Sequence, residues 1–162
     1  MRSSSHADEL EFELADEAAS MGFGADLARA APKAALVFLH GDLGAGKTTL
    51  ARGFLRQLGV SGAVRSPTYT LIEPYEFGTV VVYHLDLYRL ESVEELELIG
   101  IRDYLQSGLV LVEWPERGEK LLSEPDLKIS LRPSGEARSA TLSSCSACGD
   151  RWVARLKASS ES

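Results

Sequence analysis

The chain has 162 residues, of which 44% are hydrophobic and 25% are charged, a composition typical of a protein with a buried core. Its 24 acidic and 17 basic residues give a net charge of −7, which argues against direct, tight binding to a nucleic-acid backbone. No apolar run is long enough to span a bilayer, and the polar first residues lack the apolar core of a signal peptide, so a cytoplasmic protein is expected.

The first part of the chain is predicted to alternate strands and helices. Residues 10–14 alternate strictly between apolar and acidic side chains, which indicates a half-buried strand. Asp16 is a suitable cap for a helix over residues 17–31. Residues 35–39 are all apolar, as in a central strand that is covered on both faces. A helix with one apolar face then runs to Gly59, which is typical of a helix C-terminus.

The middle of the chain combines a hairpin, a helix and a buried strand. Two β-rich runs, residues 66–73 and 79–86, are separated by a short Gly-containing break, which predicts an antiparallel hairpin. Residues 93–105 are expected to be helical with an interruption at Gly100. Residues 109–113 form another short apolar run and hence another buried strand.

The last part of the chain is predicted to form a second hairpin, from residues 128–132 and 138–143, around a turn that contains Gly135. Residues 151–157 fit either a strand or a short helix. These elements favour one α/β domain over residues 1–162, with disordered ends at 1–9 and 158–162. The expected architecture is a P-loop NTPase-like three-layer fold with a mixed central sheet.

Residues 41–48 contain the most informative motif, a full G-x-x-x-x-G-K-[ST] phosphate loop placed between the predicted strand and helix. Its glycines let successive backbone N–H groups turn toward an anion, and the positive end of the following helix adds to that attraction. Lys47 can reach the β- and γ-phosphates of a nucleotide, and the Thr48 hydroxyl can coordinate Mg²⁺. Lys47 is expected to be exposed toward the ligand rather than packed. The residues predicted to hold the phosphates are Gly41, Asp42, Leu43, Gly44, Ala45, Gly46, Lys47, Thr48 and Thr49.

Two carboxylates are candidates for the second half of such a site. Asp86 ends one apolar run and Glu113 ends another, and ligands in α/β sheets lie beyond the carboxyl ends of the strands. Either residue could hold Mg²⁺, directly or through water, while the other orients the attacking water. The alternative is that each carboxylate points into solvent at the end of its strand and has no role in a site.

Several neighbouring residues allow two interpretations. His84 is either a site residue, sharing a strand face with Asp86, or a satisfied core histidine. Arg89 is either a stabiliser of developing phosphate charge or a partner in an ion pair. Trp114 either packs in the core, which we favour, or lies beside the nucleotide. Thr68 follows Pro67 in a hydroxyl-rich loop and is a candidate γ-phosphate sensor.

The two cysteines, Cys145 and Cys148, form one C-x-x-C pair. Zinc would need two further ligands, and the three histidines lie far away in the sequence. The pair is surrounded by Ser and Gly and is not expected to open a helix, so we interpret the cysteines as inert reduced thiols rather than a redox site.

The nucleotide is expected to be ATP. The chain contains no Asn, which removes the N-K-x-D motif that reads guanine, and no D-x-x-G follows the second strand. Two alternatives of other classes stay open, a P-loop small-molecule kinase and a nucleotide-gated binding module with negligible chemistry. No Arg-rich lid over a phosphoryl acceptor is evident.

Five short segments stand out along the chain: GDLGAGKTT, SPTYTL, HLDLYR, GIRD and EWPE, at residues 41–49, 66–71, 84–89, 100–103 and 113–116. Their order and spacing resemble those of TsaE (formerly YjeE), the bacterial ATPase of tRNA threonylcarbamoyladenosine biosynthesis. The resemblance extends from about residue 10 to residue 131.

The resemblance implies a weak ATPase, activated by partner proteins, that supports the TsaB–TsaD complex. That complex transfers a threonylcarbamoyl group to the adenosine next to the tRNA anticodon, so contact with tRNA would be indirect. The resemblance also implies ATP and Mg²⁺ as cofactors, Thr48 and Glu113 at the Mg²⁺ positions and Asp86 as the Walker-B-like catalytic acid, also near Mg²⁺. Lys47 and Thr68 complete the implied catalytic set. The oligomeric state stays open, with a monomer as one alternative.

The resemblance is loosest at the ends of the chain. Family members carry an additional Arg in the C-terminal hairpin, a role that Arg138 could fill, whereas Gly135 stands where a preceding one is expected. Asp16 or Glu17 would approach the adenine.

Overall fold

The structure is a computed structural model that describes residues 9–64, 67 and 69–161. Within these residues, seven strands form one mixed sheet in the order β1-β7-β6-β2-β5-β4-β3. The strands are β1 (Glu9–Leu14), β2 (Ala35–His40), β3 (Ile72–Phe77), β4 (Val80–Asp86), β5 (Leu109–Glu113), β6 (Leu127–Ser134) and β7 (Ala137–Ser144). The helices are α1 (Glu17–Ala30), α2 (Lys47–Leu58), α3 (Glu94–Leu98), α4 (Ile101–Leu105) and α5 (Ala147–Glu161), with a short 3₁₀ helix at Pro115–Arg117.

The centre of the sheet is parallel and its margins are antiparallel. β2 pairs in parallel with both β5 and β6, and β4 pairs in parallel with β5. The two hairpins, β3–β4 and β6–β7, and the strand β1 beside β7 add the antiparallel pairs. β2 and β5 lie in the middle because their side chains are apolar on both faces and need cover on both.

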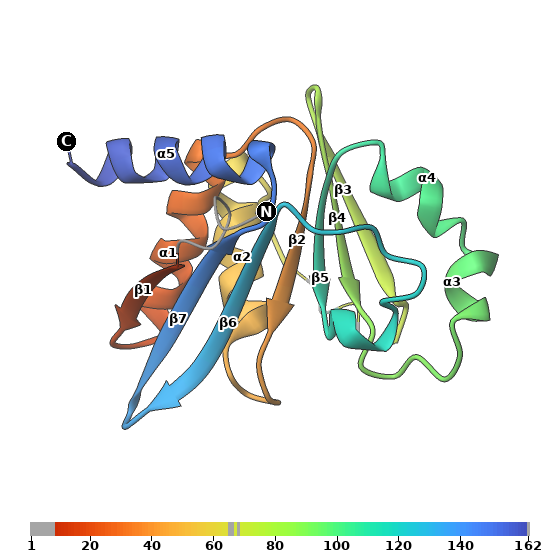
Figure 1. The fold of residues 1–162 in the computed structure, drawn as a ribbon, viewed down its shortest axis with the longest axis horizontal. Coiled ribbons are helices and arrows are strands. Elements are labelled where there is room, and N and C mark those ends of the chain that lie inside the picture. Colours follow the sequence, from red (N-terminus) through yellow and green to blue (C-terminus); the bar gives the residue numbers. More distant parts are fainter. Residues whose placement is uncertain (1–8, 65–66, 68, 162) are drawn as a thin grey trace, which may run out of the picture.

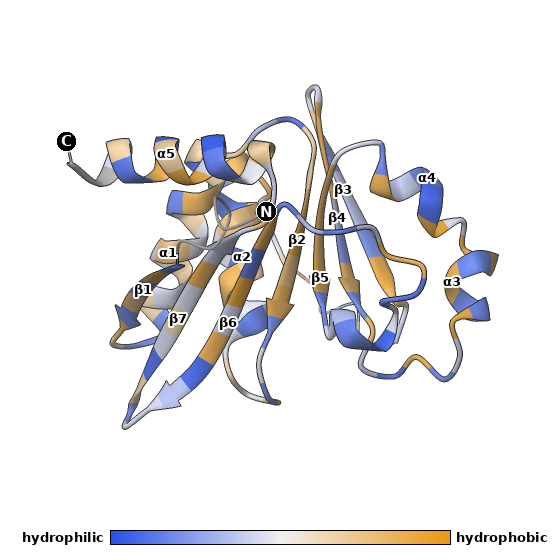
Figure 2. Cartoon of the chain, in the orientation of Figure 1, coloured by the Kyte–Doolittle hydropathy of each residue, from blue (hydrophilic) through white to orange (hydrophobic). Residues whose placement is uncertain are grey.

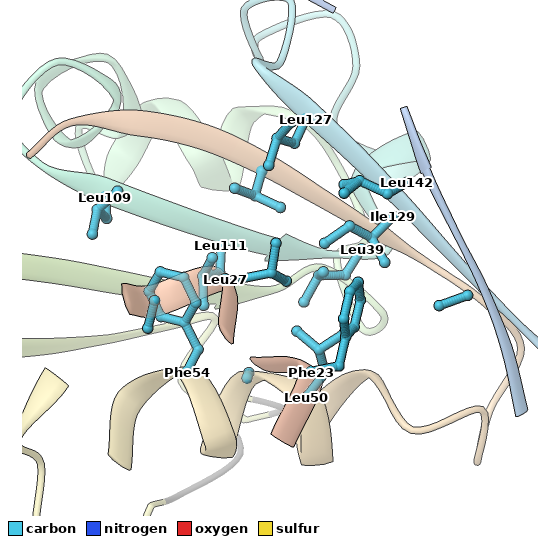
Figure 3. Packing of buried hydrophobic residues seen from close by; sticks show 14 of the residues in the cluster. Phe23, Leu27, Leu39, Leu50, Phe54, Leu109, Leu111, Leu127, Ile129 and Leu142 are labelled. Carbon is cyan, nitrogen blue, oxygen red and sulfur yellow. The ribbon is translucent and has the colours of Figure 1, made fainter. Parts of the chain in front are cut away.

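Helices cover both faces of the sheet (Figure 1). Alternate residues of β2 point to opposite sides: Val37 and Leu39 join the larger apolar cluster, with α1, α2 and α5, whereas Leu36 and Phe38 join a second cluster with α3 and α4. Figure 2 shows the apolar colouring concentrated on the central strands, and Figure 3 shows the larger cluster between the sheet and α1 and α2. The expected three-layer α/β fold with a mixed central sheet is therefore confirmed.

The hairpin in the middle of the chain differs from the prediction. β3 covers Ile72–Phe77, so the predicted break at 74–78 is mostly strand and the chain turns only at Gly78 and Thr79. Pro74 lies within β3, which is possible because β3 is an edge strand and one side of it needs no hydrogen-bond partner.

The predicted helix over 93–105 is divided into α3 and α4 at Gly100, whose φ of 74° ends the helical path, as the sequence indicated. Residues 151–157 are helical and belong to α5, which is anchored by the buried Trp152: its indole Nε1 donates to the carbonyl of Leu27 in α1 at 3.0 Å. β1 begins at Glu9 and α5 continues to Glu161, and the disorder expected at the ends of the chain stays a prediction. No helix within the described ranges combines the length and apolarity needed to cross a membrane.

Candidate nucleotide-binding site

The phosphate loop connects the end of β2 to the start of α2, as the motif requires. Gly46 is the residue before the first turn of α2 and has a φ of 104°, in the region that side chains disfavour. α2 has no side-chain cap at this end. Its first backbone N–H groups are therefore available to an anion at the position where the helix dipole also attracts negative charge.

Lys47 is packed rather than exposed, which corrects the expectation from the sequence. Only 4% of the residue is accessible to solvent. Its Nζ donates to the carbonyl oxygens of Gly41 and Asp42 and lies 4.3 Å from the centroid of the Trp114 ring. Burial lowers the pKa of Lys47, and the nearby carboxylates, Glu113 first among them, oppose that shift. The loop carbonyls of Gly41 and Asp42 thus bind the ammonium of the lysine of the same motif.

Thr48, Glu113 and His84 form a continuous hydrogen-bonded series. The Thr48 hydroxyl donates to Glu113 Oε2 at 3.0 Å, and His84 Nε2 lies 2.7 Å from the same oxygen. Glu113 and His84 are 3% and 0% exposed. β5 lies between β2 and β4 in the sheet. This order brings Glu113, at the end of β5, into contact with Thr48 in the first turn of α2.

Asp86 and Glu113 are directly opposite each other in the parallel pair of β4 and β5. Asp86 is 5% exposed, and its Oδ1 accepts from the backbone N–H of Tyr88 at 3.0 Å. Neither carboxylate leaves its strand into open solvent, so that alternative is wrong for both. His84 and Asp86 share a face of β4, but Tyr88 lies beyond the end of the strand.

These side chains meet in one cavity of about 580 Å³, which we call the P-loop cleft. It is lined by residues 43–49 together with Asp86, Tyr88, Arg89, Glu113 and Trp114. Gly41 and Asp42 are not part of its lining and instead supply the carbonyls that bind Lys47. The volume lies within the range of about 300–1,000 Å³ that is common for small-molecule sites. Thr68 falls outside the described residues.

Trp114 combines the two positions that the sequence left open. It packs against the second apolar cluster, as favoured, and it also lines the cleft. The Lys47 Nζ lies over the indole, and the ring centroid lies 5.0 Å from that of Tyr88. A position beside the nucleotide stays a prediction. The backbone has a φ of 58°, which is unusual for a residue other than glycine and turns the chain sharply after β5. The signal in the sequence was its place directly after the strand-ending acid.

Arg89 also lines the cleft, and its guanidinium carbon lies 4.6 Å from the centroid of the Tyr69 ring. Its Nη2 donates to the Tyr69 hydroxyl at 3.5 Å, and it makes no ion pair with any residue that the structure describes. Its action on phosphate charge stays a prediction.

A second, smaller pocket of about 270 Å³ lies on the other side of the phosphate loop. Arg138 reaches it from β7, and its Nη2 donates to the carbonyl of Gly44 at 3.1 Å. Asp16 and Glu17 line the same pocket. Arg138, the candidate for the family's additional Arg, thus shares one pocket with Asp16 and Glu17, the candidates for contact with the adenine. Recognition of the base in this pocket stays a prediction.

The cysteines lie far from the cleft in the fold, at the junction of β7 and α5. Contrary to the prediction, the pair does open a helix, because Cys148 lies in the first turn of α5. Burial nevertheless raises the pKa of both thiols, and the Asp126 carboxylate adds to that shift at Cys148.

The donor set of the cleft suits Mg²⁺ rather than a metal held by protein alone. Among the residues described, no group of three or more His, Cys, Asp or Glu side chains could hold a metal ion. Mg²⁺ is commonly bound by one or two carboxylates and the phosphates of a nucleotide, with water completing the octahedron. The oxygens of Thr48, Glu113 and Asp86 at one end of the phosphate loop fit that arrangement.

The fold and this site together define a P-loop NTPase-like protein. Comparison with solved structures agrees: the crystal structure of Bacillus subtilis YdiB matches with a TM-score of 0.80 at 26% sequence identity and covers 95% of this chain and 97% of that chain. The family model described as "Threonylcarbamoyl adenosine biosynthesis protein TsaE" matches residues 14–140.

Two curated relatives carry the description "tRNA threonylcarbamoyladenosine biosynthesis protein TsaE". The protein from Haemophilus influenzae is 50% identical over 111 residues, which cover 68% of this chain and 70% of that protein. The protein from Synechocystis is 42% identical over 120 residues, which cover 71% and 76%. The chain belongs to the TsaE family, as the sequence motifs indicated, and thus to the tRNA threonylcarbamoyladenosine biosynthesis pathway.

Proposed function

We propose that this protein binds ATP with Mg²⁺ in the P-loop cleft and hydrolyses it weakly in the cytoplasm. In this proposal it is the accessory ATPase of the TsaB–TsaD complex, which threonylcarbamoylates the tRNA adenosine next to the anticodon. The net charge of −7 supports indirect contact with tRNA, since the chain offers little excess basic charge for a phosphate backbone.

The observation that carries the proposal is the 3.0 Å contact between Thr48 Oγ1 and Glu113 Oε2. It joins the one side-chain hydroxyl that a phosphate loop presents to Mg²⁺ with an acid at the end of the adjacent strand. In this arrangement the loop amides and Lys47 hold the phosphates, and Thr48, Glu113 and Asp86 hold the cation. When bound, Mg²⁺ neutralises part of the charge that develops on the phosphates.

The positions of the two carboxylates support different roles for them. Glu113 accepts from the Thr48 hydroxyl in the first turn of α2, which supports a direct role at the cation. Asp86 lines the cleft one strand further away, where it can reach the cation through water and orient the attacking water. Arg89 lines the same cleft and can stabilise charge on the transferred phosphoryl group.

Phosphate release from ATP, measured with and without purified TsaB–TsaD, tests the proposal. We expect slow release from the protein alone and strong stimulation by the complex, and no release from Lys47→Ala in either condition. Phosphoryl transfer to a metabolite, with none to water, would identify a small-molecule kinase instead. ATP binding without hydrolysis in both conditions would identify a nucleotide-gated binding module.

A further inference from the structure

His84 is a fully buried polar side chain in an apolar part of the sheet. It lies on β4 opposite Leu111 of β5, and both Leu111 and Val82, two residues before His84, belong to the larger apolar cluster. A buried imidazole lowers the stability of the protein unless its nitrogens are hydrogen-bonded. The neighbours of His84 therefore determine whether the residue is only tolerated or is used.

The hydrogen bonding of His84 is one-sided. Nε2 lies 2.7 Å from Glu113 Oε2, whereas Nδ1 has no hydrogen-bond partner among residues 9–64, 67 and 69–161. A proton on Nδ1 would be a buried donor with no acceptor, so the tautomer with its proton on Nε2 fits this environment best. His84 thus donates to Glu113, and this is the one side-chain hydrogen bond that its ring makes within the described residues.

The Glu113 carboxylate accepts hydrogen bonds from two residues, one at the cleft and one in the core. On one side Thr48, in the first turn of α2, donates its hydroxyl from the edge of the P-loop cleft, where ligand binding changes its surroundings. On the other side His84 is enclosed by the core and cannot move with the loop. If the Thr48 hydroxyl turned toward a bound cation, His84 would be the contact that keeps the Glu113 carboxylate in place.

We propose that His84 is a positioning residue of this site: its Nε2–H fixes the Glu113 carboxylate in the orientation that lets Thr48 and Glu113 act together on Mg²⁺. The inference rests on the proposed function. It assigns a purpose to a histidine that leaves one buried nitrogen unpaired, an arrangement that an apolar side chain of similar size would avoid. Outer-shell partners of this kind typically change metal affinity by about 10–100-fold when they are removed.

Two amide substitutions of His84 test whether the site needs a donor at the position of Nε2 or only a polar side chain. In His84→Gln the amide nitrogen can reach the position of Nε2, whereas in His84→Asn it reaches only that of Nδ1. His84→Leu fills the core without a donor and provides a second variant in case His84→Asn does not fold. Circular dichroism and thermal melting establish which variants are folded.

The readout is ADP affinity by calorimetry, measured once with Mg²⁺ and once with EDTA. The gain from Mg²⁺ is the ratio of the ADP affinity with Mg²⁺ to the ADP affinity in EDTA. We expect His84→Gln to keep this ratio, and we expect the ratio to fall by about tenfold or more in His84→Asn and His84→Leu. ADP affinity in EDTA should stay unchanged in all three variants, because Lys47 and the loop amides do not touch His84.

Two results would overturn the inference. One is a wild-type gain from Mg²⁺ in folded His84→Leu, and the other is an equal loss of affinity with and without Mg²⁺ in every variant. Wild-type protein that binds no ADP under either condition would overturn the proposed function itself, which keeps the two failures apart.

Discussion

Lys47 carries a charge that the protein holds almost out of contact with water. Its ammonium is bound to two backbone carbonyls and lies against Trp114, and burial lowers its pKa. These contacts must be released for Lys47 to reach a phosphate. A phosphate that binds Lys47 therefore has to replace contacts that the ammonium already makes within the protein.

Lys47→Met should abolish ATP binding and hydrolysis without unfolding the protein. The substitution removes a cation that is stabilised by the two carbonyls and Trp114 but destabilised by burial, so we expect the free energy of unfolding to change by less than about 1 kcal/mol. We expect kcat/KM to fall by at least about 100-fold, since a charge-stabilising donor is lost. Urea denaturation and phosphate release measure the two effects, with the exposed Lys120→Met as the matched control.

Unfolding of Lys47→Met under native conditions would contradict this assignment, because it would make the lysine a structural residue. Normal hydrolysis by a folded Lys47→Met would contradict its role in holding phosphate.

At the scale of elements, the phosphate loop depends on how closely α1 packs against α2. A Cβ added to Gly53 of α2 would lie 2.1 Å from the carbonyl oxygen of Met21, and one added to Gly24 of α1 would lie 2.1 Å from that of Leu50. The two backbones therefore approach each other at both points, which no side chain permits. This contact sets the direction in which the first turn of α2 points.

Gly53→Ala should lower the free energy of unfolding by about 2–3 kcal/mol, because its methyl group would force the two helices apart. Gly22→Ala is the matched control: a Cβ there meets nothing within 4 Å, and the change should raise stability by about 0.5–1 kcal/mol through lower chain entropy in the unfolded state. Urea denaturation of both variants measures the difference. Equal effects of the two substitutions would contradict the close packing of α1 and α2.

The thiols at the start of α5 should react slowly. A raised pKa means a smaller thiolate fraction at any given pH, and the thiolate is the reactive form. We expect Cys145 and Cys148 to react with Ellman's reagent more slowly than the same thiols in urea at pH 8, and faster as the pH rises above the ordinary cysteine range. Phosphate release by Cys145→Ser/Cys148→Ser should match the wild type. Rapid modification at pH 7, or a large loss of phosphate release, would restore a redox or metal role.

For the molecule as a whole, the ligand should add to the stability of the fold. The P-loop cleft joins residues from β2, α2, β4 and β5, so a ligand that bridges them opposes unfolding of the sheet and the helix together. At a concentration about 100 times Kd, a ligand specific to the native state adds about 2.7 kcal/mol. For a chain of this size that corresponds to a rise in Tm of about 5–10 °C.

Mg²⁺ with ADP should therefore raise Tm by several degrees in a thermal-shift experiment, and the rise should be absent in Lys47→Met. The ATP assignment further predicts a smaller rise with Mg²⁺ and GDP. An equal rise with both nucleotides would leave the phosphate site intact and contradict only the preference for adenine.

The parts of the site that a short segment identifies by itself could be predicted from the sequence. The phosphate loop was evident because its glycines, lysine and threonine must follow one another for the backbone to surround an anion. Asp86 and Glu113 were evident because each ends an apolar run, and parallel strands bring their carboxyl ends to one edge. The family motifs at the same positions made the assignment specific.

The hairpin at β3 and the C-x-x-C segment were harder to predict, because both depend on position within the fold. Pro74 looked like part of a break because nothing local indicates that β3 is an edge strand. Cys148 enters a helix because α5 packs on α1, where the side chain of Trp152 reaches Leu27 across 125 residues of sequence.

The sequence by itself determined the class of fold, the phosphate loop and the family, because these depend on short, contiguous patterns and on the alternation of apolar side chains. The tertiary structure alone decided which side chains touch. The order of strands puts β5 between β2 and β4, and this order brings Thr48, Glu113 and His84 into one hydrogen-bonded series and leaves Lys47 on Trp114. Strand order and register arise from packing over the whole sheet, and no local segment of the chain encodes them.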